Sequence, residues 1–164
     1  MTSTPTPSQT VGPFFWFGLC EQPSNEVVAG GPVRIVGRVL DGAGNPVPDA
    51  MVETWQADES GSYRGRFGWG RCGTDFEGRF SFTTVKPGSV DGQASHLEVL
   101  VFARGLLKPL LTRIYFPGDA HDGDRVLGAV TEAERETLVA SAEADVLRFD
   151  VRLQGDGQTT FFAL

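Results

Sequence analysis

The sequence predicts an all-β fold, an antiparallel β-sandwich with one short helix. Glycine and proline, which favour turns, account for 21 and 10 of the 164 residues. Between these turn residues lie short segments in which apolar and polar side chains alternate, as they do in strands with one buried face. Seven or so such segments beside a single helical signal are typical of two packed antiparallel sheets.

The expected elements follow from the periodicity of each segment. The first strand places Val33, Ile35 and Val39 on one face. In chain order, the expected strands are 33–39, 51–55, 80–84, 97–101, 110–116, 147–153 and a closing segment at 159–164. The one expected helix lies near 131–142, because Thr131 and Glu134 have the spacing of a capping box ahead of apolar residues.

The chain is expected to consist of an N-terminal arm, residues 1–18, and one sandwich domain, residues 19–164. The arm ends in four consecutive aromatic residues, Phe14–Phe17, with no alternation that would keep half of them dry. Two interpretations remain open. The arm folds back over its own sandwich, or it lies on another chain, since large apolar patches often mark interfaces.

Charge and composition exclude several classes of function. The chain has 14 Lys and Arg against 21 Asp and Glu, a net charge of −7, which argues against nucleic-acid binding. We expect a cytoplasmic protein, because no apolar run is long enough to span a membrane and the first residues do not resemble a signal peptide. Cys20 and Cys72 are expected to be reduced thiols in that compartment.

Four segments together carry a resemblance to a known family. They are WQADESGSY at 55–63, TVKPG at 84–88, HLEVLVFARG at 96–105 and TRIYF at 112–116. In this order they resemble the intradiol ring-cleaving dioxygenases, and the resemblance covers nearly the whole chain. It implies a β-sandwich of the intradiol dioxygenase type and the O2-dependent cleavage of a dihydroxylated aromatic ring.

The resemblance also implies a non-haem ferric site built from two tyrosines and two histidines, donors that suit Fe(III). The first tyrosine falls on Tyr63 and the first histidine on His96. The second tyrosine falls on Val90, which cannot bind a metal, and the second histidine on Glu98, on the same strand face as His96. The arginine that precedes the histidine pair falls on Gln93. The four ligand positions therefore resemble a relic of a metal site.

One branch of the family is built from related α and β subunits, of which only β carries the intact iron site. The decayed ligand set resembles α. This implies a non-catalytic chain that binds no metal itself and completes the pocket of a β partner, which holds the Fe(III) and acts on protocatechuate and O2. The resemblance places Thr10, Gly12, Pro13 and Arg113 against the substrate, and it implies that the arm, residues 1–18, reaches the β partner and is anchored there by its aromatic residues. A guanidinium suits the substrate carboxylate because it can donate two parallel hydrogen bonds.

Other interpretations stay open at this level. Without the family, Arg113 is expected to pair with one of the 21 acidic residues instead. Tyr63, His96 and Glu98 present oxygen and nitrogen donors that would suit a rearranged metal site in a self-sufficient iron enzyme. A third possibility is a stand-alone, transthyretin-like sandwich that binds a ligand and needs no second subunit.

Overall fold

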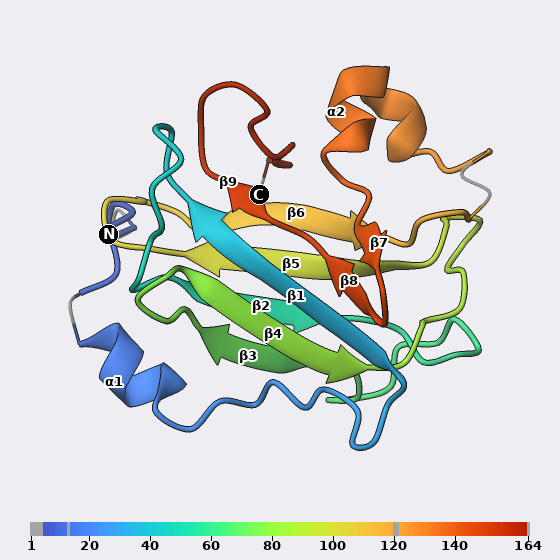
Figure 1. Cartoon of the computed structure of the whole chain (residues 1–164), viewed down its shortest axis with the longest axis horizontal. Helices are drawn as coiled ribbons and strands as arrows, with labels where there is room; N and C mark the ends of the chain where they lie inside the picture. Colours follow the sequence, from blue (N-terminus) through green and yellow to red (C-terminus); the bar gives the residue numbers. More distant parts are fainter. Residues whose placement is uncertain (1–4, 13, 120–121, 164) are drawn as a thin grey trace.

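Two β-sheets packed on one another form the structure, a computed structural model that describes residues 5–12, 14–119 and 122–163 (Figure 1). In Figure 1, β1 and β4 cross in front of β2 and β5, so the two layers are seen one behind the other. The prediction of a mostly β sandwich is confirmed. No helix in the described part of the chain has the length and apolar character needed to cross a membrane.

The first sheet has the strand order β4-β1-β8-β7, and β9 also pairs with β1. Its strands are β1 (Val33–Leu40), β4 (Arg79–Thr84), β7 (Ser141–Glu143), β8 (Val146–Arg148) and β9 (Val151–Arg152). Both β8 and β9 run parallel to β1, so this sheet is mixed and not antiparallel throughout as expected. The segment expected as one strand over 147–153 is split because the Arg38 amide donates to the Asp150 carboxylate, 2.9 Å away, and not to a backbone carbonyl.

The second sheet is antiparallel throughout, with the order β3-β2-β5-β6. Its strands are β2 (Met51–Trp55), β3 (Gly70–Gly73), β5 (His96–Phe102) and β6 (Leu110–Tyr115). Of the closing segment expected at 159–164, the described part contributes an isolated bridge between Phe162 and Leu111 and no regular strand.

The core lies between the sheets and is made by alternate residues of each strand. Its buried members include Ile35, Val39, Phe80 and Phe82 from the first sheet and Leu97, Val99, Val101 and Ile114 from the second. Burying each of these large side chains contributes about 1.5–3 kcal/mol. Since successive side chains alternate in direction, this core leaves Glu98 and Leu100 on the outer face of β5.

The expected helix is present but shorter. The capping box forms as predicted, because the Glu134 carboxylate accepts from the Thr131 amide at 2.8 Å and the Thr131 hydroxyl accepts from the Glu134 amide at 3.3 Å. However, α2 spans only Glu132–Glu136, preceded by the 3-10 turn η1 (Leu127–Ala129). The chain then becomes extended, since Leu138 and Ala140 form backbone hydrogen bonds with Tyr115 of β6.

The aromatic run forms a second helix that the sequence patterns do not predict, α1 (Phe15–Cys20). Its Trp16 and Cys20 face β3, where an added Cβ on Gly73 would lie 2.6 Å from Trp16 Nε1. Phe14 and Phe17 point away and are 78% and 62% exposed. The interpretation in which the run folds back on its own sandwich therefore holds for Trp16 and Cys20, and an arm that reaches a partner subunit stays a prediction.

Candidate functional site

A hollow of about 520 Å³ lies on the outer face of the second sheet, away from the core between the two sheets. Most of the side chains that line it are aromatic or apolar; they include Trp55, Tyr63, Trp69, Leu100 and Leu111, with Glu98 as a charged member. Trp55 and Tyr63 are in ring contact, with centroids 4.6 Å apart. A half-open apolar hollow with few charged groups is the usual form of a small-molecule site.

Three of the four positions expected to be a relic metal site gather beside this hollow. His96 and Glu98 project from the outer face of β5, with His96 Nε2 and Glu98 Oε1 3.5 Å apart. Tyr63 comes from the loop after β2; burial raises the pKa of its phenol, and the nearby charge of Glu98 adds to the shift. Val90 lies in a turn closed by its backbone hydrogen bonds with Gln93. Its side chain has no atom that can bind a metal ion.

Arg113 pairs with Glu98 across the two neighbouring strands. The two residues are directly opposed in the β5–β6 register. Arg113 Nη2 lies 2.7 Å from Glu98 Oε1, and the side chains are only 14% and 25% exposed. Arg113 Nη1 also donates to Gln93 Oε1 at 2.7 Å and to the Tyr115 hydroxyl at 3.1 Å. The guanidinium is thus held by three partners of its own chain, one of them an acidic residue, as composition alone suggested.

His96 keeps the orientation of a metal-binding imidazole. Its Nδ1 lies 2.7 Å from the Ala94 carbonyl oxygen, which can only accept, so Nδ1 carries the proton that it donates. Nε2 is left facing Glu98. Metal-binding histidines are typically held in this way, through their second ring nitrogen. The ring is buried and lies against Tyr115, with centroids 5.4 Å apart.

The ionisation states in this cluster follow from burial and from Arg113. Burial alone would raise the pKa of Glu98, but the hydrogen bond of His96 and the charge of Arg113 outweigh this effect and lower it. Burial raises the pKa of Tyr115 to about 12, although Arg113 opposes the shift. At neutral pH the cluster therefore holds a carboxylate, a guanidinium and a neutral phenol.

These residues do not fit the ferric ion that the family uses. Val90 supplies no donor, the phenol of Tyr63 holds its proton more tightly than usual, and the carboxylate of Glu98 is bound to Arg113. Throughout residues 5–12, 14–119 and 122–163, no group of three or more His, Cys, Asp or Glu side chains is placed to hold a metal ion.

The arm residues that the resemblance assigned to the substrate lie elsewhere on this chain. The Thr10 hydroxyl accepts from the Gly105 amide at 2.9 Å, which places Thr10 and Gly12 by the loop that follows β5. The Glu98–Arg113 pair lies three residue pairs, or about 10 Å, from Val101–Leu110, which is the last pair of the hairpin before that loop. Within this chain, the described arm residues and Arg113 are therefore not brought together, and Pro13 lies outside the described residues.

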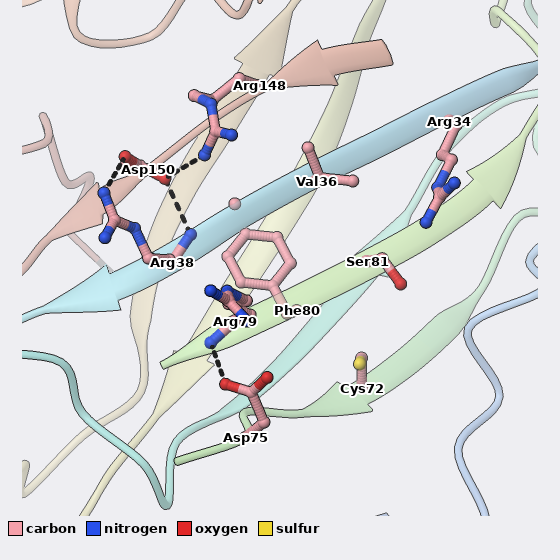
Figure 2. A pocket seen from close by; sticks show the side chains of 11 residues that line it. Arg34, Val36, Arg38, Cys72, Asp75, Arg79, Phe80, Ser81, Arg148 and Asp150 are labelled. Carbon is pink, nitrogen blue, oxygen red and sulfur yellow. Dashed lines mark hydrogen bonds and ion pairs between the residues drawn. The ribbon is translucent and has the colours of Figure 1, made fainter. Parts of the chain in front are cut away.

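Sequence reasoning also did not find a second hollow, of about 550 Å³, on the outer face of the first sheet (Figure 2). Its lining includes Arg34, Arg38, Arg79 and Arg148 together with Asp75 and Asp150. The sequence feature that could have indicated this hollow is the presence of Arg34 and Arg38 on the outward face of β1. The charges are largely balanced within the chain, since Arg38 pairs with Asp150 and Arg148 pairs with Glu143. This hollow is separate from the cluster around Arg113.

Comparison with known proteins defines the class to which this fold and site belong. A family model described as "Dioxygenase" matches residues 18–155, and the chain belongs to the intradiol ring-cleavage dioxygenase family. It is a homologue of protocatechuate 3,4-dioxygenase α chains. It is 41% identical to the α chain of Burkholderia cepacia over 96% of both proteins, and 35% identical to that of Pseudomonas putida over 96% of this chain and 95% of the relative.

The β chain of the Burkholderia cepacia protein is more distant, at 32% identity over 77% of this chain and 66% of the relative. Among solved structures, the dioxygenase domain of a Streptomyces carbohydrate-binding fusion protein superposes with a TM-score of 0.67 at 26% identity, covering 93% of this chain and 99% of that one. Hydroxyquinol 1,2-dioxygenase of Pseudomonas putida gives 0.62 at 25% identity, over 92% and 66%. The fold is therefore that of the family.

Proposed function

We propose that this chain is the non-catalytic α subunit of a heteromeric protocatechuate 3,4-dioxygenase. The assembled enzyme would cleave 3,4-dihydroxybenzoate between its two hydroxylated carbons with O2, giving 3-carboxy-cis,cis-muconate, a step of aromatic degradation by the β-ketoadipate pathway. The observation that carries the proposal is the Glu98–Arg113 ion pair at a position where the family has a metal-binding histidine. The 41% identity to an α chain over 96% of both proteins supports it.

In this proposal the β partner holds the Fe(III), which supplies the chemistry of oxygen insertion when bound there. This chain completes the substrate pocket. Arg113 has five N–H donors, of which three serve Glu98, Gln93 and Tyr115. The remaining donors would bind the substrate carboxylate, and the internal partners would hold the guanidinium in a fixed direction. Thr10, Gly12 and Pro13 would border the pocket from the arm.

The experiment that tests the proposal measures iron content and ring cleavage of this chain alone and after co-expression with a β subunit from the same source. We expect neither iron nor activity in the lone chain, and both in a stable complex. Stoichiometric iron with activity in the lone chain would overturn the proposal in favour of a self-sufficient enzyme. A lone chain that is stable and does not bind the β subunit would favour a stand-alone binding module.

The role of Arg113 is tested in the assembled enzyme. Arg113→Ala should raise KM for protocatechuate by roughly tenfold or more, since a charged hydrogen bond to the carboxylate is lost, and should leave the iron content unchanged. Arg148→Ala, which removes an arginine from the outer face of the first sheet, is the matched control and should leave KM as it is. An unchanged KM in Arg113→Ala would remove this residue from the substrate site.

A further inference from the structure

A cation of the protein itself, Arg113, lies against one of the relic positions, with Nη2 2.7 Å from Glu98 Oε1. We propose that the guanidinium of Arg113 takes the place of a metal ion among Tyr63, His96 and Glu98, and that it keeps metal ions out of this site. On this proposal, metal binding is prevented both by Arg113, which occupies the site, and by the replacement of two ligands by Val90 and Glu98. The inference rests on the contacts of Arg113 and stands whether or not the chain assembles with a β subunit.

The first support is that the polar groups of the cluster converge on Arg113. Glu98 Oε1 and Gln93 Oε1 each lie 2.7 Å from a guanidinium nitrogen, and the Tyr115 oxygen lies 3.1 Å away. Carboxylate, amide and phenol oxygens surround one cation here, as oxygen donors surround a metal ion elsewhere.

The second support is that several donors of a metal site remain in working order. The imidazole of His96 is held through Nδ1 by the Ala94 carbonyl, so Nε2 points at Glu98 in the cluster. Glu98 adds carboxylate oxygens, and its Oε1 lies 3.5 Å from His96 Nε2. Tyr63 adds a phenol at the edge of the hollow. These three side chains could bind a divalent cation if the centre were free.

The third support is electrostatic. A divalent cation on Glu98 would lie within a few ångströms of the guanidinium, and like charges at that separation repel strongly in a partly buried site. The carboxylate cannot serve both cations at full strength. The backbone of Arg113 is also fixed, because the pairs Leu97–Ile114 and Val99–Thr112 flank the Glu98–Arg113 pair in the β5–β6 register. Turning the side chain away would break its bonds to Gln93 and Tyr115.

The experiment is a titration of the full-length chain with Co²⁺, followed by calorimetry and by the visible absorption of the bound ion. We compare the unmodified chain with Arg113→Met, which removes the charge and retains much of the apolar stem. Arg113→Lys keeps a cation at the site. Arg148→Met is the matched control, since it removes an arginine that pairs with Glu143 on the other sheet.

Arg113→Met should bind one Co²⁺ with an affinity roughly tenfold or more above that of the unmodified chain. Arg113→Lys and Arg148→Met should not gain affinity. Adding Glu98→Gln to Arg113→Met should remove the gain, which ties the bound ion to this carboxylate. Circular dichroism confirms that each variant is folded. A folded Arg113→Met chain with unchanged affinity, or an unmodified chain that binds Co²⁺ equally well, would overturn the proposal.

A second measurement needs no substitution and covers the case in which Arg113→Met does not fold. Nitrogen NMR of the arginine side chains in the unmodified chain should show slow rotation and slow hydrogen exchange at the Arg113 guanidinium, and both should persist when Co²⁺ is added. An Arg113 guanidinium that rotates as freely as Arg34, which has no ion pair in the described part of the chain, would contradict the proposal. An Arg113 guanidinium that begins to rotate freely when Co²⁺ is added would also contradict it.

Discussion

Arg113 and Glu98 lie directly opposite one another on β5 and β6, with Nη2 and Oε1 2.7 Å apart. The pair is a consequence of register, because cross-strand neighbours have their side chains on the same face of the sheet. Each residue alone would be a poorly solvated charge on a largely apolar outer face. Together they form a neutral, hydrogen-bonded unit that also engages Gln93 and Tyr115.

Removing one partner of this pair should destabilise the chain more than removing both. Glu98→Gln or Arg113→Met should each lower the free energy of unfolding by about 2–4 kcal/mol, because the remaining group loses its partner in a partly buried site. The double variant Glu98→Gln/Arg113→Met should lose less than either single variant, and therefore less than the sum of the two. Urea unfolding of the four proteins measures this coupling, and strictly additive losses would show that the two side chains act independently.

Acid should destabilise the chain through Glu98. The pKa of this carboxyl in the folded chain lies below its ordinary value of 4.5, since the hydrogen bond of His96 and the charge of Arg113 outweigh burial. The contribution is therefore fully present above that ordinary value and is lost as the pH falls through the lowered pKa. Urea unfolding between about pH 5 and pH 3 should show a smaller loss of stability in Glu98→Gln than in the unmodified chain.

Other carboxyls with lowered pKa values, such as Asp124 and Glu134, contribute to the acid response of both proteins. The difference between the two proteins therefore isolates Glu98. Parallel curves for Glu98→Gln and the unmodified chain would mean that this carboxyl titrates alike in the folded and unfolded states.

Within the aromatic run, we expect Trp16 to contribute to the stability of the fold, and Phe14 and Phe17 to contribute to assembly with a β subunit. Trp16→Ala should lower the free energy of unfolding by about 1–3 kcal/mol, because Trp16 packs beside Gly73 of β3. The double variant Phe14→Ser/Phe17→Ser should leave stability nearly unchanged, since these rings are 78% and 62% exposed. Its complex with a β subunit should be weaker by size-exclusion chromatography. An unaltered complex would mean that the two rings contact no partner.

Both thiols should be slow to react in the folded chain. Cys20 and Cys72 are free and only 5% and 8% exposed. Burial raises the pKa of Cys20 to about 11 and also raises that of Cys72, so little thiolate is present near neutral pH. Labelling with a disulfide reagent should be roughly a hundredfold slower than in urea. Equal rates with and without urea would mean that the thiols are open to solvent.

The strands that alternation predicted are those with a clear apolar face, such as β1, β5 and β6. The strand β3 was not predicted, because two of its four residues are glycine and give no alternation. The helix α1 was missed for a similar reason: it has no side-chain cap, and aromatic residues are only moderate helix formers. The early end of α2 depends on Tyr115, a distant residue that draws Leu138 and Ala140 into backbone pairing.

The site was predicted in part. The motifs identified Tyr63, His96 and Glu98, and β5 does present His96 and Glu98 together because they are two residues apart. The pairing of Arg113 with Glu98 depends on which residues of β5 and β6 face one another, a register that alternation alone does not give. The composition favoured an acidic partner for Arg113 but did not indicate which of the 21 acidic residues it would be.

The segment between α1 and β1 joins the open sides of the two sheets. Ser24 exchanges two backbone hydrogen bonds with Arg71 of β3, and Asn25 and Val28 each form one with Thr83 of β4. At the other border of the second sheet, β6 is bridged by Val139 and Phe162. Several of the backbone groups that could recruit a foreign strand are thus occupied at these borders, which guards the chain against open-ended strand addition. In the proposed assembly, contacts with the β subunit would therefore be directed to side-chain surfaces, where shape and charge can select the partner.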